Sequence, residues 1–347
     1  MAKRMKSKIQ PSVMKLNFSL QKYDRGNLTT IPSGEFATRF IDLSQVASVV
    51  NRRFYRQGLN WAVSHFKVTT PKDCSVIIQK LPNTWVMSNA WEKSFRAWQK
   101  MNKEALAENP SVKPKFLDFK VFADQYHHQM GIAGNLLPIT IQYDTLNQST
   151  TTTTATAGEW VYSKVVVPET TTATGAATEY ELIAVGPNNS GAGDSGLDAK
   201  SLIEGYAASR GLPNVLDPNT PDDANVYAQN WMMAMFNDGT LQDNVVIEDM
   251  ITENNQAPYP YEGDGTATDT QYPGGANQMP GLEIHEFSTV TGTTVGGMTI
   301  LPGGNFPCGL IAISIDNTSD TAIAPSLEIT LVPGNHRGYL AESMTEM

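Results

Sequence analysis

The feature that most constrains the fold of this chain is a series of short apolar segments with strand-like alternation. The clearest covers residues 59–68 (LNWAVSHFKV), where apolar and polar side chains alternate for part of the length, as in a half-buried strand. The sequence TPKD follows at residues 70–73 and supplies turn-forming residues. Repetition of this pattern predicts a chain built mainly of β-strands.

Comparable segments occur near both ends of the chain. They cover residues 13–20, 36–43, 75–81, 116–122, 160–167, 282–287, 308–315 and 327–332. We expect about eight to ten strands, with the first and the last in one sheet, because a β-sandwich protects its edges by pairing strands distant in sequence. The predicted fold class is mainly β: a single jelly-roll β-sandwich with a short amphipathic helix and long loop insertions. A larger two-part sandwich is the alternative.

One helix is predicted between the early strands. Asn89 is a candidate N-cap with Glu92 three residues later, and Trp91, Phe95 and Trp98 recur at helical spacing. The opposite face is basic and contains Lys93, Arg96, Lys100 and Lys103. The sequence therefore predicts an amphipathic, basic helix that ends before residues 109–110 (NP).

The expected organisation is a flexible basic arm at residues 1–11 followed by a jelly-roll domain at 12–347. Within that domain, residues 145–281 contain Thr-rich and acidic segments, which we expect to form long surface insertions. Two short helices are expected there, near 201–210 and 224–236, and residues 238–281 are expected to form a long loop.

Charge is divided unevenly along the 347 residues. Residues 1–135 contain 21 Lys and Arg against 9 Asp and Glu, a net charge of +12, whereas the remainder contains 4 against 26, a net of −22. Such a division is typical of a protein with one surface for a polyanion and another for solvent. A dipolar soluble protein without a nucleic-acid role is the alternative.

The two cysteines, Cys74 and Cys308, have neither disulfide nor metal-ligand spacing, so we expect free buried thiols. The basic N-terminus lacks the apolar run of a signal peptide, and no segment is apolar enough to span a membrane. These features favour a protein made in a reducing compartment, without a membrane partner.

The sequence offers weak candidates for catalysis or metal binding. Residues 193–196 (GDSG) resemble the nucleophile segment of chymotrypsin-like proteases, but no histidine stands in a matching context, so a polar turn is expected. His127 and His128, if on a strand, would point to opposite faces rather than to one metal. Acidic clusters at 217–223, 248–253 and 262–264 lack calcium-loop spacing. We therefore predict no enzyme activity, no cofactor and no metal site.

Basic residues interleaved with aromatic ones provide a stronger signal. They occur at residues 51–57 (NRRFYRQ) and in the helix at 91–103. Guanidinium groups bind phosphate and planar rings stack on unpaired bases, which suits sequence-independent nucleic-acid binding. The predicted nucleic-acid-binding residues are Lys3, Arg4, Lys6, Lys8, Lys15, Arg52, Arg53 and Arg56. Alternatively, the rings belong to the core and the arginines to an ordinary exposed turn.

Three segments resemble one family. Residues 40–63 (FIDLSQVASVVNRRFYRQGLNWAV), 81–93 (LPNTWVMSNAWEK) and 331–342 (LVPGNHRGYLAE) are similar to capsid (coat) proteins of small circular Rep-encoding single-stranded DNA (CRESS-DNA) viruses. The resemblance extends over the first ~140 and last ~40 residues and weakens in the Thr-rich middle. Many such capsid proteins begin with a long arginine-rich arm, whereas this chain has only four basic residues before Pro11.

The resemblance implies a viral structural protein that self-assembles into an icosahedral shell of about 60 copies. Its partners would be other copies of the chain and the single-stranded DNA genome, packaged by sequence-independent contacts, with no membrane partner. It would be located in the virion after assembly inside the host cell; no host receptor is indicated. The alternative function is that of a non-viral β-sandwich binding module for carbohydrate or a cell surface.

Overall fold

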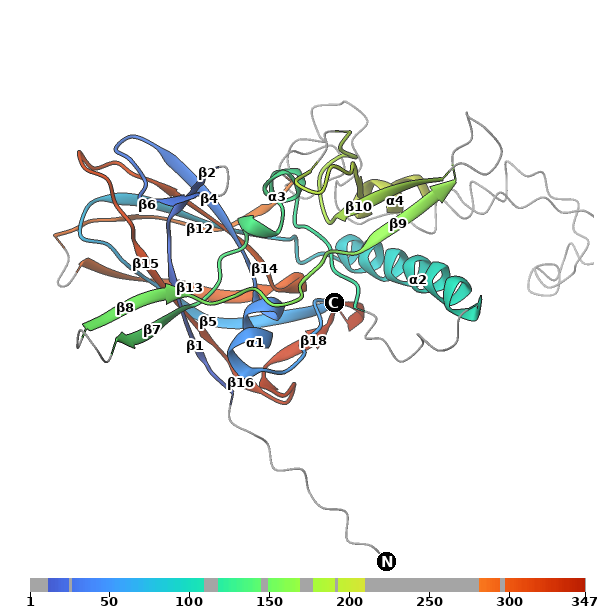
Figure 1. Ribbon diagram of the computed structural model, residues 1–347, viewed down its shortest axis with the longest axis horizontal. Helices are drawn as coiled ribbons and strands as arrows, with labels where there is room; N and C mark the ends of the chain where they lie inside the picture. The colour runs from blue at the N-terminus through green and yellow to red at the C-terminus, as the bar shows by residue number, and fades with distance from the viewer. Residues whose placement is uncertain are drawn as a thin grey trace, which may run out of the picture.

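The computed structural model describes residues 12–24, 27–108, 118–144, 149–168, 177–190, 193–209, 281–293 and 297–346. Strands dominate these residues, and most of them pair antiparallel (Figure 1), so the predicted mainly β class is confirmed. The predicted arm at residues 1–11 lies outside the described residues, as do the helix expected at 224–236 and, except for Gly281, the loop expected at 238–281.

Two antiparallel sheets form the centre of the molecule. The first has the order β1 (Lys15–Ser19), β15 (Ser326–Leu331), β5 (Leu59–Thr69) and β13 (Met298–Phe306), and β18 (Ala341–Ser343) also pairs with β5. The second has the order β12 (Glu283–Val290), β6 (Cys74–Lys80), β14 (Leu310–Asp316) and β4 (Phe36–Asp42). Most of these strands match predicted segments to within a few residues.

Strands distant in sequence are neighbours in both sheets. β1 pairs with β15, β4 with β14, β5 with β13, and β6 with β12, all antiparallel. The four pairs are therefore nested: β6 and β12 form the innermost pair and β1 and β15 the outermost, as if the chain were one long hairpin with its turn between β6 and β12. The prediction that the first and last of the expected strands share a sheet is confirmed.

The main core lies between the two sheets. In β5, Trp61, Val63, Phe66 and Val68 are buried against the other sheet, following the alternation seen in the sequence. β14 is buried on both faces: Ile311 belongs to the main core, whereas Leu310 and Ala312 belong to a second apolar cluster with helix α2. Each large apolar side chain buried in this way contributes about 1.5–3 kcal/mol to folding.

Helix α1 (Leu43–Asn51) follows β4 directly and was not predicted. Its N-cap is Asp42, whose Oδ1 accepts hydrogen bonds from the backbone N–H groups of Ser44 and Gln45 at 2.9 and 3.3 Å. The helix contains several valines, and β-branched residues favour strands, which hides the helical signal in the sequence. The cap and the packing of its buried face decide the structure.

The connection between β6 and β12 contains most of the remaining elements. These are α2 (Trp85–Glu108), α3 (Gln125–Met130), η2 (Ile132–Gly134), β7 (Ile139–Asp144), β8 (Ser149–Thr154), β9 (Lys164–Pro168), β10 (Ala177–Ile183), β11 (Ala199–Ser201) and α4 (Leu202–Ser209). In Figure 1, α2, α4, β9 and β10 lie together on one side of the two-sheet body. The helix expected near 201–210 is confirmed as α4.

Short elements complete the fold. They are β2 (Lys22–Asp24), β3 (Asn27–Thr29), η5 (Pro307–Gly309), β16 (Pro333–Gly334), β17 (Gly338–Tyr339) and η6 (Met344–Glu346). Cys74 and Cys308 are free and buried, as expected from their spacing. No helix within the described ranges is long and apolar enough to cross a lipid bilayer.

The predicted start of the amphipathic helix was wrong. α2 begins at Trp85 and is long rather than short, and Asn89 lies inside it, donating from its side chain to the carbonyl oxygen of Trp85 at 3.0 Å. Thr84 supplies the capping contact instead, because its Oγ1 accepts the Met87 N–H at 3.3 Å. Thr is a good N-cap, so residues 82–84 (PNT) held the true start signal.

Three further segments differ from expectation. Asp118 to Val121 lie in no strand, and Phe122 makes only an isolated bridge to Ile183. Trp160 to Ser163 precede β9 instead of forming it. The Thr-rich segment expected as a loop forms β8, paired with β7, because Thr is β-branched and suits an extended backbone.

Candidate nucleic-acid interface

Four arginines meet where α1 ends and the β16–β17 hairpin turns; we call Arg52, Arg53, Arg56 and Arg337 the arginine cluster. Arg52 is the C-cap of α1 and has left-handed backbone angles (φ 54°, ψ 41°), and its N–H donates to the carbonyl oxygen of Ser48. Arg337, in the hairpin, is also left-handed (φ 51°). Each such conformation costs a non-glycine residue about 1–2 kcal/mol, so two of the cluster's arginines occupy unfavourable backbone positions.

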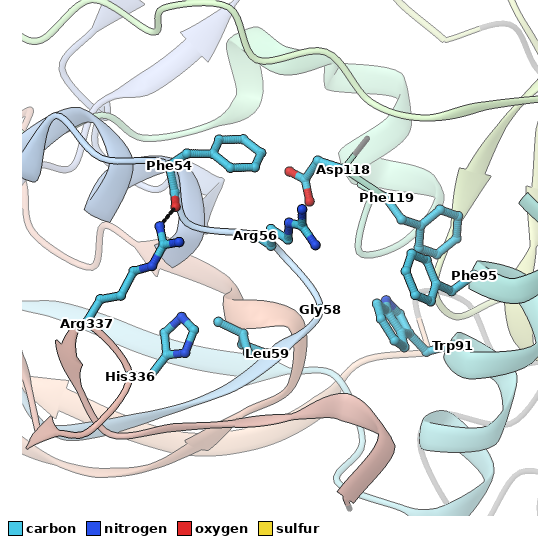
Figure 2. Close-up of a pocket in the computed structure, with 10 residues that line it drawn as sticks. All are labelled: Phe54, Arg56, Gly58, Leu59, Trp91, Phe95, Asp118, Phe119, His336 and Arg337. Carbon is cyan, nitrogen blue, oxygen red and sulfur yellow. Dashed lines mark hydrogen bonds between the residues drawn. The ribbon is translucent and has the colours of Figure 1, made fainter. Parts of the chain in front are cut away.

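Hydrogen bonds connect the hairpin to the segment after α1. The guanidinium of Arg337 donates to the carbonyl oxygen of Phe54 (Figure 2). The same guanidinium lies 6.0 Å from the centre of the Tyr55 ring, and the Tyr55 hydroxyl donates to the carbonyl oxygen of Arg337 at 3.2 Å. The fold therefore holds Arg337 close to Arg56, although the two are distant in sequence.

Ser12 and Val13, at the N-terminal end of the described residues, also contact this surface. Ser12 Oγ donates to the carbonyl oxygen of Arg337 at 2.8 Å, and the N–H of Val13 donates to Asn51 Oδ1 at 3.0 Å. The Tyr339 hydroxyl donates to the carbonyl oxygen of Val13 at 2.6 Å. The predicted binding residues Lys3, Arg4, Lys6 and Lys8 lie outside the described residues, but the segment that carries them joins the fold here.

The cluster presents positive charge that is weakly neutralised. Arg52, Arg56 and Arg337 are exposed. None of the ion pairs among the described residues includes any of these three. Burial raises the pKa of nearby Asp118, and the charges of Lys120 and Arg56 lower it in part. Arg56 thus interacts electrostatically with the Asp118 carboxylate without forming an ion pair with it. Exposed guanidinium groups outside ion pairs are suited to phosphate, which they bind through two parallel hydrogen bonds.

A hollow of about 600 Å³ lies beside Arg56 and Arg337. Figure 2 shows Trp91, Phe95 and Phe119 along one side of it, with Arg56 and Arg337 on the others. The Trp91 and Phe95 rings are stacked with centroids 4.9 Å apart. The structure thus brings the two basic and aromatic segments of the sequence, 51–57 and the helix at 91–103, to one concave surface.

Other basic residues have partners elsewhere. Lys15, on β1, pairs with Glu328 at 3.0 Å. On α2, Arg96 pairs with Glu92, and the Lys93 ammonium lies 5.8 Å from the centre of the Tyr206 ring. Arg337 was missed as a site residue, and its only sequence signal is the polar turn at 335–338 (NHRG). The arginine cluster is therefore the strongest candidate interface.

The two adjacent histidines lie in helix α3, not in a strand, and both are fully buried. His127 Nδ1 accepts the N–H of Ala123 at 3.0 Å, so Nε2 carries the proton and donates to Asn135 Oδ1 at 2.6 Å. Asn135 Nδ2 donates to Gln45 Oε1 and to the Tyr162 hydroxyl, each at 2.9 Å. We call His127, Asn135, Gln45 and Tyr162 the buried polar centre; Asn135 links the other three, whereas Gln45 Nε2 has no hydrogen-bond partner among the described residues.

Burial determines the protonation of this centre. It lowers the pKa of His127 to about 3, partly offset by the hydrogen bond to Asn135. It also raises the pKa of Tyr162 well above its usual value. Both side chains are neutral at physiological pH, and this favours a structural role.

The segment at 193–196 lies next to a histidine and an acid, but in the wrong order for catalysis. Ser195 Oγ donates to Glu181 Oε2 at 2.8 Å, and His128 Nε2 lies 2.9 Å from the same oxygen. A serine nucleophile needs the histidine between itself and the acid, so that the imidazole can take the hydroxyl proton. Here the carboxylate lies between the other two groups.

No group of three or more His, Cys, Asp or Glu side chains in the described part of the chain is arranged to hold a metal ion. The acidic clusters at 217–223, 248–253 and 262–264 lie outside that part. Comparison of the chain with protein-family models, with curated proteins and with solved structures finds no match in any of the three.

Proposed function

We propose that this chain is the shell-forming subunit of a capsid, of the kind found in CRESS-DNA viruses, and that it packages single-stranded DNA without reading its sequence. The observation that carries the proposal is the arginine cluster, exposed at the point where the basic N-terminal segment joins a two-sheet β-sandwich. The resemblance of residues 40–63, 81–93 and 331–342 to such capsid proteins is a separate support.

Strand pairing supports a jelly roll. If β1, β4, β5, β6, β12, β13, β14 and β15 are numbered one to eight, the pairs are one with eight, two with seven, three with six, and four with five. Rolling a long hairpin into two sheets produces this nested order. Jelly rolls occur in viral capsid domains but also in lectins and cupins, so the fold alone does not select the function.

Charge supports contact with a phosphate backbone. Lys8 is four residues from Ser12, so the chain length limits its separation from the start of the described fold to about 14 Å. Lys8 would therefore be able to reach a strand bound at the arginine cluster, to which Ser12 is hydrogen-bonded. Together, Lys8 and the arginine cluster would displace counterions from a strand, giving binding that weakens steeply with salt and does not depend on sequence.

Exposed apolar side chains support self-assembly. Phe36 and Ile284 are 54% and 59% exposed and line an apolar groove of about 520 Å³ on the outer face of the second sheet. Phe287 and Ile300 are 59% and 64% exposed. Burying such residues between copies would favour association, and closed symmetry would limit the product to a shell.

The test is to purify the full-length protein at moderate salt, image it by negative-stain electron microscopy, and digest the same fraction with nuclease. We expect uniform closed particles that protect single-stranded DNA. Monomers or small oligomers that stay free of nucleic acid across a range of salt and pH would overturn the proposal in favour of a binding module. Particles that protect only RNA would reject the DNA assignment.

A further inference from the structure

We infer that the hollow beside Arg56 and Arg337 accepts one unpaired base of the bound strand. The protein would thereby prefer a strand with accessible bases to a duplex or to a bare sugar-phosphate chain. This inference rests on the proposed nucleic-acid binding and adds a base-binding site to it. Phosphate contacts alone do not require a hollow.

The dimensions of the hollow suit such an occupant. Its volume of about 600 Å³ falls within the ~300–1,000 Å³ typical of sites for small organic ligands. A base within a duplex has both faces covered by its neighbours and cannot enter without leaving the stack. An unpaired base has exposed faces and can enter at lower cost.

Aromatic rings form one wall of the hollow. Phe95 is partly exposed, whereas Trp91 and Phe119 behind it are 5% and 2% exposed. The Phe95 and Trp91 planes are inclined by 22°, and the Phe119 centroid lies 5.7 Å from that of Phe95. The buried Trp91 and Phe119 rings thus fix the partly exposed Phe95 ring at the edge of the hollow. Stacking of a base on such a ring strengthens binding by roughly 5- to 150-fold.

The same wall contains an unused hydrogen-bond donor. Trp91 Nε1 is buried and has no hydrogen-bond partner among the residues that the structure describes. An indole N–H can only donate, and leaving it unpaired in the protein interior is destabilising. Gly58 makes room for the indole, because a Cβ there would lie 2.3 Å from Trp91 Cζ2.

Cations stand on the other sides of the hollow. Figure 2 shows Arg56 next to the Asp118 carboxylate, and Arg337 on the opposite side from the Trp91 ring. Both guanidinium groups are exposed, and neither takes part in an ion pair within the described residues. A base on the Phe95 ring would therefore have its flanking phosphates within reach of arginines. This combination of ring, donor and cations distinguishes the hollow from the apolar groove on the second sheet.

The experiment compares three oligonucleotides of about 15 nucleotides: oligo-dT, an abasic strand of equal length, and a duplex. Fluorescence anisotropy with the full-length protein gives each dissociation constant. We expect wild-type protein to bind oligo-dT roughly tenfold more tightly than the abasic strand, which is the effect of stacking one base. Phe95→Ala should remove this ratio while leaving affinity for the abasic strand unchanged. The matched control is Trp85→Ala, which removes an exposed ring on the same helix but outside the hollow and should preserve the ratio.

A second measurement covers the case in which Phe95→Ala does not fold. Oligo-dT should quench tryptophan fluorescence of the wild type more than the abasic strand does, and Trp91→Phe should lose most of that difference. Equal wild-type affinity for oligo-dT and the abasic strand, or an unchanged ratio in folded Phe95→Ala, would overturn the base site and leave phosphate binding intact. Failure to bind any of the three oligonucleotides would overturn the proposed function itself.

Discussion

Arg56 and His127 both have side chains common in functional sites, but the fold places them in opposite surroundings. Arg56 is exposed beside a hollow, and no ion pair among the described residues includes it. His127 is fully buried, stacks on Phe40 at 4.2 Å between ring centroids, and uses both ring nitrogens in hydrogen bonds inside the molecule.

The difference shows that residue type alone does not identify a binding surface in this protein; what matters is whether the polar groups are already paired within the fold. The buried polar centre contains residue types typical of active sites, yet each hydrogen bond it forms ends on another protein group. In the arginine cluster, Arg52 and Arg56 are exposed and take part in no ion pair among the described residues, so their guanidinium groups can still bind phosphate. We therefore expect changes in the buried polar centre to alter folding and pH sensitivity, and changes in the arginine cluster to alter binding and salt sensitivity.

The largest effect is expected from Asn135→Ala. It removes the partner of His127, Gln45 and Tyr162 at once, and each buried polar group left unpaired costs about 1–3 kcal/mol. The free energy of unfolding should fall by about 3 kcal/mol or more, measured by urea denaturation. Asn17→Ala, at an exposed position on β1, is the control and should change it by less than about 0.5 kcal/mol. A small effect of Asn135→Ala would mean that the centre is not structural.

The next largest effect concerns binding. Replacing Arg52, Arg53 and Arg56 together by Ala should weaken affinity for single-stranded DNA about 100-fold at moderate salt and lower packaged nucleic acid. The slope of log affinity against log salt should become shallower by about 2, since each lost phosphate contact contributes about 0.7. Stability should change much less than affinity.

The control for this triple variant removes the same charge from other surfaces, by Ala at Lys67, Lys72 and Lys164. It should retain most of the affinity if the arginine cluster is the interface. Packaging by the arginine variant equal to that of the wild type would remove these residues from the proposal.

A third prediction separates the regions by pH. The pKa of His127 is lowered to about 3 by burial, below its ordinary value of 6.5, so between these values only the unfolded chain binds the proton. Its contribution to stability is therefore complete above pH 6.5 and decreases as pH falls toward 3. This loss amounts to about 2 kcal/mol by pH 5. His127→Gln should be less stable at pH 7, and its deficit should shrink by that amount at pH 5.

Two buried acids have the opposite effect on the pH dependence of stability, but their effect is the same in wild type and variant and drops out of the difference between them. Burial raises the pKa values of Asp42 and Asp124 to about 7, so both favour the folded state more at low pH, in wild type and variant alike. A deficit that stays constant between pH 7 and 5 would contradict a neutral His127. NMR titration of the wild-type ring, expected to show no protonation above about pH 4, provides a check that does not need the variant.

The smallest expected effect is a gain in stability at the cluster. Arg52 holds a left-handed backbone conformation at the end of α1, where glycine is usual. Arg52→Gly should raise the free energy of unfolding by about 0.5–1 kcal/mol and weaken DNA binding by about one phosphate contact. Arg52→Lys should keep the binding without the stability gain. Destabilisation by glycine would show that the arginine stabilises the fold.

The sequence alone predicted most strands of the two-sheet body because their alternation is local. Residues 59–68 alternate since one face of β5 packs on the core and the other does not. Helix α1 was missed because its valines favour strands and its cap, Asp42, lies at the end of a strand. The start of α2 was misplaced because both Thr84 and Asn89 are acceptable caps, and packing selects the first.

The candidate site was predictable only in part, because residue type does not determine exposure. Arg39 and Arg56 are alike in sequence, yet Arg39 is buried and donates to the carbonyl oxygens of Gly134, Ala133 and Asn135 at 3.1 to 3.3 Å. Arg337 belongs to the site only because the β16–β17 hairpin near the C-terminus packs against residues near the N-terminus, such as Ser12 and Phe54. Its one local signal, the polar turn at 335–338, does not indicate a binding residue.

By itself, the sequence determined the mainly β class, the concentration of positive charge in the first third of the chain, and the two segments that combine arginines with aromatic rings. These properties depend on residue type and spacing, which are local. Only the tertiary structure decided that the segments meet at one hollow, that Arg337 joins them, and that the histidines are enclosed. Those outcomes depend on pairing between strands far apart in the chain, where burial and long-range packing, not local preference, determine which polar groups stay free to bind.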